Sequence, residues 1–280
     1  MQIALDAHVC RRPSLEATLA AIAGHGIHAT QFTLDLVPGL KALPTEVPPV
    51  VCDLVRQACA TAGVGLASIS GTYNMIDPDL ARREDGARRL RTLIAACPRL
   101  GVPVITLCTG TRDPHSMWHP HPDNGSAEAW RDLVQSLAGV LPDAEAYGVT
   151  LALEPEVSNV IDSAARARRL MAEMGSPRLK VCIDGANLFH AGELPRMSAI
   201  LEEAFALLGA DIVLAHAKDL DHDGAAGDLP AGQGRLDYAR YLSLLAGAGF
   251  QGAVVLHGLS EAQVDPCAGF LRQHLAALGQ

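Results

Sequence analysis

Four ionisable side chains follow four short apolar runs in the second half of the chain. They are Glu154, Asp184, His216 and His257, and each closes a run rich in Val, Leu, Ile or Ala. Two carboxylates and two imidazoles make a mixed oxygen and nitrogen ligand set, which suits divalent Mn, Co, Fe, Ni or Zn. An ion held in this way, with open positions, can bind and polarise a carbonyl or hydroxyl group of a substrate. The alternative interpretation is a polar network that holds no metal.

These apolar runs belong to a recurring pattern, which must position the four residues. A helical segment ends at glycine, the residue that adopts the left-handed conformation without penalty, and a short apolar run follows at once. The glycines are Gly26, Gly63, Gly101, Gly148, Gly209 and Gly249. The runs predict eight buried parallel strands, at Ile3–Ala7, Ala29–Leu34, Gly65–Ser70, Val104–Thr109, Thr150–Glu154, Lys180–Asp184, Ile212–His216 and Ala253–His257. Helices are expected at Leu15–Ala23, Val51–Ala62, Leu80–Arg99, Ala127–Tyr147, Ala164–Met174, Met197–Leu208, Tyr238–Ala248 and Pro266–Leu278.

Eight alternating strands and helices predict an α/β fold, a (β/α)8 TIM barrel that forms a single domain over residues 1–280. A doubly wound open sheet is the competing fold. That fold usually carries a glycine-rich loop after its first strand, where this chain has Ala7–Cys10 with no glycine. In a barrel the carboxyl ends of all strands meet at one mouth. The four ionisable residues are therefore expected to converge there.

Composition excludes several other classes of protein. A net charge of −9 disfavours a protein that binds the phosphate backbone of nucleic acids. The seven cysteines are scattered and contain no CxxC pair, which indicates reduced thiols in a cytoplasmic protein. No segment has the pattern of a transmembrane span or a signal peptide, so we expect no membrane partner.

Several motifs carry a family resemblance that extends over nearly the whole chain. They are Leu151–Pro155, Asp184, His216–Asp219, Gly232–Asp237 and Gly249–Gly252. In these the chain resembles the xylose-isomerase-like TIM-barrel superfamily, which includes sugar and sugar-phosphate isomerases and epimerases, inosose dehydratase and endonuclease IV. The resemblance implies one divalent metal ion, held by Glu154, Asp184, His216 and the residue at the end of the eighth strand. That ion could be Mn, Co, Mg, Fe, Ni or Zn.

The chain departs from the family pattern at two positions. His257 stands at the end of the eighth strand, where the family usually has Glu, and Asn187 stands where the family often has His. In the ketose epimerases that Glu and the Glu of the fifth strand act as an acid/base pair. Histidine can bind a metal and move protons, but it does not simply inherit the carboxylate role. Endonuclease IV needs three zinc ions, and the ends of the third and fourth strands here offer no His, so DNA repair is disfavoured.

Further residues are candidates for contact with a substrate. The long loop after the fourth strand carries Trp118, which could stack on a sugar face. Lys218 could stabilise an enediolate or a phosphate, and Glu156 could act as a base or support Glu154. The full set of expected substrate-binding residues is Asn187, Lys218, Trp118, Glu156, His8 at the barrel mouth, and Arg235 as a phosphate contact.

The leading hypothesis is a divalent-metal-dependent isomerase or epimerase of a sugar, sugar phosphate or polyol. Glu154 or His257 would move a proton through a metal-stabilised, enediolate-like intermediate. One alternative is a metal-dependent lyase on the same site, a dehydratase of a keto-polyol or of a dehydroshikimate-like acid. Another is a degenerate barrel that binds a ligand without turnover. The expected partner is a small carbohydrate or polyol; a homo-oligomer stays open, because relatives are often dimers or tetramers.

Overall fold

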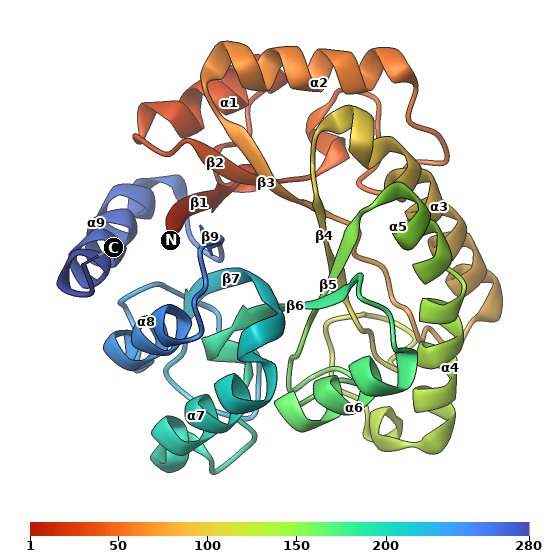
Figure 1. The fold of residues 1–280 in the computed structure, drawn as a ribbon, viewed down its shortest axis with the longest axis vertical. Coiled ribbons are helices and arrows are strands. Elements are labelled where there is room, and N and C mark those ends of the chain that lie inside the picture. The colour runs from red at the N-terminus through yellow and green to blue at the C-terminus, as the bar shows by residue number, and fades with distance from the viewer. Residues whose placement is uncertain (280) are drawn as a thin grey trace.

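Eight parallel strands close into a barrel in the computed structural model, which describes residues 1–279 (Figure 1). The strands are β1 (Gln2–Asp6), β2 (Ala29–Phe32), β3 (Gly65–Ser70), β4 (Val104–Cys108), β5 (Thr150–Glu154), β6 (Leu179–Asp184), β7 (Ile212–Asp219) and β9 (Ala253–Leu256). Each strand pairs with the next, and pairing of β9 with β1 closes the ring. The predicted (β/α)8 barrel is therefore confirmed.

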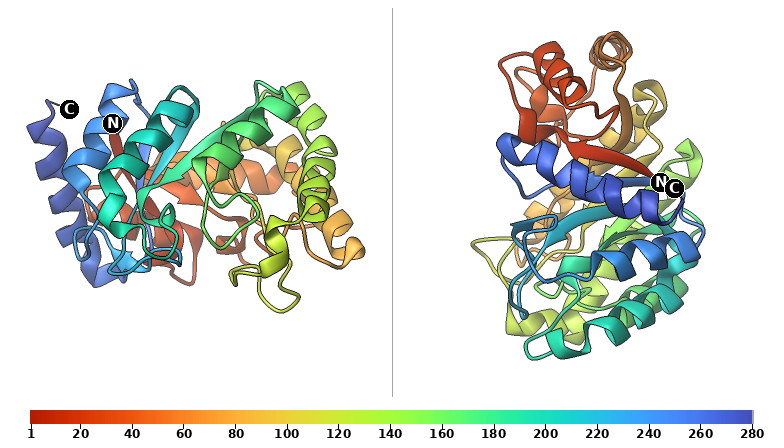
Figure 2. Two further views of the ribbon diagram at one scale, coloured as in Figure 1. Left: turned by 90° about the horizontal axis from the view of Figure 1, so that it is seen from below. Right: turned by 90° about the vertical axis from the view of Figure 1, so that its left-hand side faces the viewer.

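Helices surround the barrel on the outside (Figures 1 and 2). They are α1 (Leu15–Gly24), α2 (Pro49–Ala62), α3 (Leu80–Leu100), α4 (Ala127–Ala138), α5 (Leu141–Tyr147), α6 (Ala164–Met174), α7 (Met197–Leu208), α8 (Tyr238–Gly247) and α9 (Val264–Ala277). Side-chain oxygens of Ser14, Ser126 and Ser163 accept hydrogen bonds from backbone N–H groups in the first turns of α1, α4 and α6. These caps fix where each helix begins after its loop.

The structure corrects three expectations from the sequence. The helix expected over Ala127–Tyr147 is two helices, because Gly139 and Pro142 interrupt it; proline lacks an amide donor and suits only a first turn, where it stands in α5. Gly209 has φ −50° instead of the left-handed conformation that the other five glycines of the pattern adopt. Strand β7 also continues beyond His216 to Asp219, where it pairs antiparallel with the short β8 (Leu229–Pro230).

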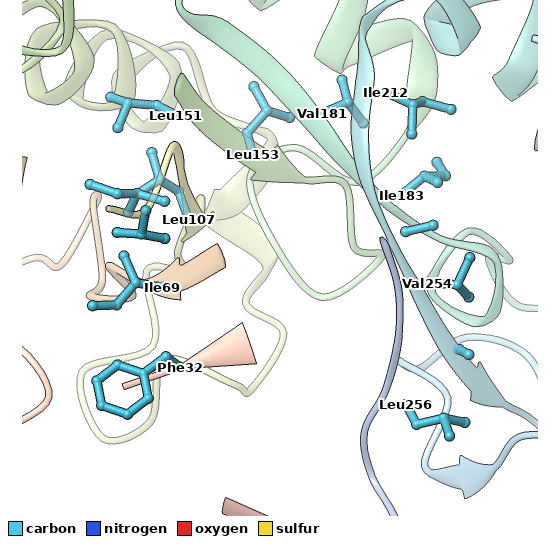
Figure 3. Packing of buried hydrophobic residues seen from close by; sticks show 14 of the residues in the cluster. Phe32, Ile69, Leu107, Leu151, Leu153, Val181, Ile183, Ile212, Val254 and Leu256 are labelled. Atoms are coloured by element: carbon cyan, nitrogen blue, oxygen red, sulfur yellow. The ribbon is translucent and has the colours of Figure 1, made fainter. Parts of the chain in front are cut away.

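The alternation of side chains along each strand divides the apolar core into an outer part and an inner part. Large apolar side chains pack outward between strands and helices, as Leu151, Leu153, Val181 and Ile183 do (Figure 3). Mostly small residues, together with Leu214, fill the inside of the barrel, namely Ala4, Ala29, Val104, Ala152, Cys182, Ala253 and Val255.

Successive side chains of a strand point to opposite faces, so the residue two positions after an inward one also faces inward. By this rule the inward positions that follow Ala152, Cys182, Leu214 and Val255 are Glu154, Asp184, His216 and His257. Glu154 and Asp184 end their strands and His257 directly follows β9, whereas His216 lies within β7, in register with Asp184. The fold therefore positions the four ionisable residues at the barrel mouth.

Two global features bear on the expectations from composition. Within residues 1–279, no helix combines the length and the apolar character that crossing a membrane requires. All seven cysteines are buried free thiols.

Candidate active site at the barrel mouth

Asp184 and two basic side chains form one half of the cluster at the mouth. Asp184 is wholly buried at the end of β6, and its Oδ2 lies 3.2 Å from Nε2 of His257 and 3.4 Å from Nζ of Lys218. Lys218 is itself 9% exposed. An unpaired buried carboxylate would be costly, so this pairing makes its ionised form tolerable inside the barrel.

Glu154 and His216 form the other half. Nδ1 of His216 lies 3.3 Å from Oε1 of Glu154, and the Asn187 amide donates to the same oxygen at 2.8 Å. The two halves meet because the rings of His216 and His257 lie 4.3 Å apart, centroid to centroid. The structure thus brings together all four expected metal ligands, together with Asn187 and Lys218.

Gln31, at the end of β2, is a member of this cluster that the sequence analysis missed. Its Oε1 lies 3.0 Å from Nε2 of His216 and accepts a hydrogen bond from Ser68, while its amide donates to Asp6. His216 is therefore held at both ring nitrogens. Gln31 could have been found by parity, because it lies two residues after the inward Ala29 at a strand end.

The charges at the mouth follow from these contacts. Burial opposes ionisation of Asp184, but the charge of Lys218 and the hydrogen bond from His257 outweigh it and lower its pKa. Burial likewise opposes a charged His216, yet the neighbouring Cys182 and Glu154 raise its pKa well above the ordinary value. Burial and the charge of His216 lower the pKa of His257, which leaves that imidazole neutral.

Glu156 lies just beyond β5 and is 8% exposed. Burial and the nearby charge of Glu154 raise its pKa to about 7. This carboxyl group can therefore exchange a proton close to neutral pH, which is the property of a general acid or base.

The donor set fits a divalent metal ion. Donor atoms of Asp184, His216 and His257 lie within 4.8 Å of one another, and Glu154 adjoins them through His216. Carboxylate oxygens with imidazole nitrogens are the ligands of Mn, Fe, Co, Ni and Zn sites. A ligating imidazole needs a free lone pair, so the neutral His257 suits coordination as it stands, whereas the charged His216 would have to release a proton when an ion binds.

The remaining expected substrate-binding residues lie in different surroundings. His8 lines the same hollow as His257, a cavity of about 760 Å³ that also borders Asp6 and Asp228, and its Nε2 lies 3.0 Å from Oδ1 of Asp35. Trp118 is 56% exposed on the long loop after β4, which extends beyond the barrel (yellow-green in Figure 2, left). Arg235 is exposed between β8 and α8. Within residues 1–279 the structure describes no contact that joins Trp118 or Arg235 to the cluster.

Comparison with known proteins gives one family and several solved structures of the same fold. The family model described as "Xylose isomerase-like TIM barrel" matches residues 19–273. A D-tagatose 3-epimerase-like protein superposes with a TM-score of 0.79 at 16% identity, over 100% of this chain and 98% of its own. An L-ribulose 3-epimerase gives 0.76 at 19%, over 99% and 95%. The 3-keto-D-glucoside 4-epimerase YcjR of E. coli gives 0.74 at 18%, over 98% and 99%.

Proposed function

The chain belongs to the xylose isomerase-like TIM barrel family, and on that premise we propose that it is a divalent-metal-dependent isomerase or epimerase of a small sugar, sugar phosphate or polyol. The observation that carries the proposal is the convergence of Glu154, Asp184, His216 and His257 at one barrel mouth. This substrate class is supported by neighbours of the same fold named as a D-tagatose 3-epimerase-like protein, an L-ribulose 3-epimerase and a 3-keto-D-glucoside 4-epimerase.

Each residue of the cluster has a distinct part in this proposal. A divalent ion held by Glu154, Asp184, His216 and His257 would supply Lewis acidity toward a substrate carbonyl or hydroxyl. Asp184 holds Lys218, whose ammonium group favours negative charge on a substrate oxygen. Water is excluded from Asp184, which is wholly buried, and largely from Glu156, whereas the side chain of Glu154 is 18% exposed.

The proton beside the carbonyl needs an acceptor at the mouth. Glu154 has a pKa below its ordinary value, since His216 outweighs the opposing effect of burial, and it is therefore a ready carboxylate base. His257 is a neutral imidazole and can accept a proton from the other side of the cluster. A carboxylate and an imidazole replace the two-carboxylate pair of the ketose epimerases, so the two directions of proton transfer should differ in their pH dependence.

Isotope exchange tests the proposal directly. The protein, loaded with Mn²⁺ or Co²⁺, is incubated in D2O with a panel of ketoses, aldoses and their phosphates, and products are followed by NMR. We expect deuterium at the carbon beside the carbonyl, and loss of at least about 100-fold in rate for Glu154→Gln and His257→Gln, the scale of a general acid or base. His121→Gln, in the loop after β4, is the matched control and should keep the wild-type rate. Absence of exchange and turnover with every metal and substrate would exclude the proposal.

A lyase remains the second candidate, and one observation favours it. Glu156 is buried beside Glu154 and has a pKa of about 7, so it can donate a proton to a departing hydroxyl group. Elimination and isomerisation both begin with removal of the same proton. The product mass distinguishes them, because a dehydratase lowers it by one water and an isomerase leaves it unchanged.

A further inference from the structure

A second group of metal-ligating side chains lies outside the barrel mouth. Cys10 follows β1, His25 ends α1, and Glu261 begins the turn before α9. Their donor atoms all lie within 4.8 Å of one another, although the residues come from opposite ends of the sequence. Thiol, imidazole and carboxylate together are the ligand types of zinc sites.

The orientation of His25 is the second observation that points to a cation. Its Nδ1 lies 2.7 Å from Oδ1 of Asp265, in the first turn of α9. That contact leaves Nε2 facing Glu261, with 3.7 Å between Nε2 and Oε1. A metal-ligating histidine almost always donates its other ring N–H to a carboxylate or carbonyl, which fixes the tautomer and the ring. In this chain Asp265 is the carboxylate beside the other ring nitrogen of His25.

Cys10 and Glu261 can supply the other two ligands for a cation. Cys10 is wholly buried, so its sulfur faces the protein interior rather than solvent. Burial raises the pKa of its thiol to about 11, and a cation would have to displace that proton. Nη2 of Arg12 lies 2.5 Å from Oε1 of Glu261, the same oxygen that faces His25, and this contact fixes the carboxylate beside the imidazole.

We propose that Cys10, His25 and Glu261 form a zinc site that fastens the first strand–helix unit of the barrel to the last. The position supports this role, because β1 pairs with β9 and these two strands close the ring. Figure 2 (right) shows α9 alongside the red N-terminal segment. An ion here crosslinks residues 10, 25 and 261 across that seam. Because its ligands come from both ends of the sequence, the site exists only in the folded ring, and the free energy of zinc binding adds to the stability of the fold.

Cobalt spectroscopy tests the site, because a thiolate bound to Co²⁺ gives a charge-transfer band in the near ultraviolet. The full-length protein is titrated with Co²⁺ alone. We expect the band in the wild type and its loss in Cys10→Ser. Cys59→Ser, a buried cysteine of α2, is the matched control, and Cys182→Ser removes the cysteine beside the mouth; both should keep the band. A wild type without the band, or a band lost in Cys182→Ser and kept in Cys10→Ser, would overturn the proposal.

Zinc affinity gives a second measurement that does not depend on the buried thiol. Zn²⁺ is titrated by competition with a chromophoric chelator, and the fold of each variant is checked by circular dichroism. Asp265→Asn should weaken binding at this site about 10- to 100-fold, because it disturbs the orientation of His25 without removing a ligand. His25→Gln should abolish binding there. If both variants keep the wild-type zinc affinity and stoichiometry, the proposal is wrong.

Discussion

Asp184 and Lys218 define the barrel mouth at the scale of single residues. The carboxylate is wholly buried and the ammonium group is 9% exposed, so water does little to stabilise either charge. Their mutual attraction and the hydrogen bond from His257 offset part of the cost of burying them. Removal of one partner should therefore cost far more than the pair itself contributes.

The first prediction follows for Lys218→Met, which keeps most of the side-chain volume. Without added metal we expect a loss of about 3 kcal/mol in the free energy of unfolding, because Asp184 loses its ion pair and keeps only hydrogen bonds with the neutral His257 and the Ala186 N–H. Urea unfolding followed by circular dichroism measures it. Lys41→Met, an exposed lysine, is the control and should change the stability little. A Lys218→Met protein as stable as that control would show that the ion pair does not stabilise the mouth.

At the scale of elements, a glycine in each of two helices allows the effect of helix propensity on stability to be distinguished from the effect of packing. Gly86 lies inside α3, and a Cβ built there would stand 2.1 Å from Cδ2 of Tyr73. Gly269 lies inside α9, where a Cβ would meet nothing within 4 Å. Alanine is better than glycine in a helix by about 0.5–1 kcal/mol. Only the neighbours of the new methyl group differ between the two sites.

The second prediction contrasts these two substitutions. Gly269→Ala should stabilise the protein by up to about 1 kcal/mol. Gly86→Ala should destabilise it by about 1–3 kcal/mol, because the partly buried Tyr73 ring must shift and the overpacking exceeds the gain in propensity. Thermal unfolding of the two variants beside the wild type measures both. If both substitutions changed the stability equally and in the same direction, packing of residue 86 against Tyr73 would not affect the stability of the protein.

An ion-pair cluster joins α6 to the amino-terminal ends of β6 and β7, at the end of the barrel away from the mouth. Asp211, just before β7, lies 2.5 Å from both Arg168 of α6 and Lys180 of β6. Burial opposes its ionisation, but the hydrogen bonds from Arg168 and Lys180 outweigh burial and lower its pKa below the ordinary 3.8. A carboxylate with a lowered pKa in the folded state stabilises the protein above its unfolded pKa, and this stability is lost as the pH falls.

The third prediction states the pH range in which Asp211 stabilises the folded protein. Asp211→Asn should lower the free energy of unfolding by about 1 kcal/mol near neutral pH. The difference from the wild type should shrink as the pH falls below the ordinary pKa of 3.8, where the unfolded wild-type carboxyl group also binds a proton. Urea unfolding between neutral pH and about pH 3 measures it. Asp53→Asn, at an exposed pair with Arg99, should show a smaller and flatter difference; a pH-independent loss for Asp211→Asn would contradict the assignment.

At the scale of the whole molecule, the closed barrel explains why the amino-acid sequence predicts so much of the site. Side-chain parity along each strand repeats every two residues, so strand ends such as Glu154 and Asp184 are expected at one mouth from the sequence alone. The alternation of strands and helices likewise predicts the number of units. The break between α4 and α5 was missed, although Gly139 and Pro142 are both residues that interrupt helices.

Contacts between distant segments could not be predicted in the same way. The alternation along β2 places Gln31 at the mouth, but its contact with His216 arises only because the ring closes. The same is true of the group that Cys10 forms with His25 and Glu261. Nothing in local periodicity encodes which residues of the first and last units become neighbours. The long loop after β4 is expected from the sequence, but its path is not, because the segment has no periodic structure and the 56% exposure of Trp118 depends on that path.

The last prediction concerns the whole molecule: binding of a metal ion should raise the stability of the folded protein. An ion that binds only the folded protein raises the free energy of unfolding by about 2.7 kcal/mol at a free concentration of about 100 times Kd. We therefore expect Mn²⁺ or Co²⁺ to raise Tm, and a chelator to reverse the rise. His216→Ala should abolish the part of the shift that comes from the mouth, while Cys10→Ser should abolish only the part that Zn²⁺ produces at the seam. Differential scanning calorimetry with each ion separates the two. If His216→Ala keeps the full Mn²⁺ shift, the four residues at the mouth are a polar network and not a metal site, and the proposed proton transfer loses its Lewis acid.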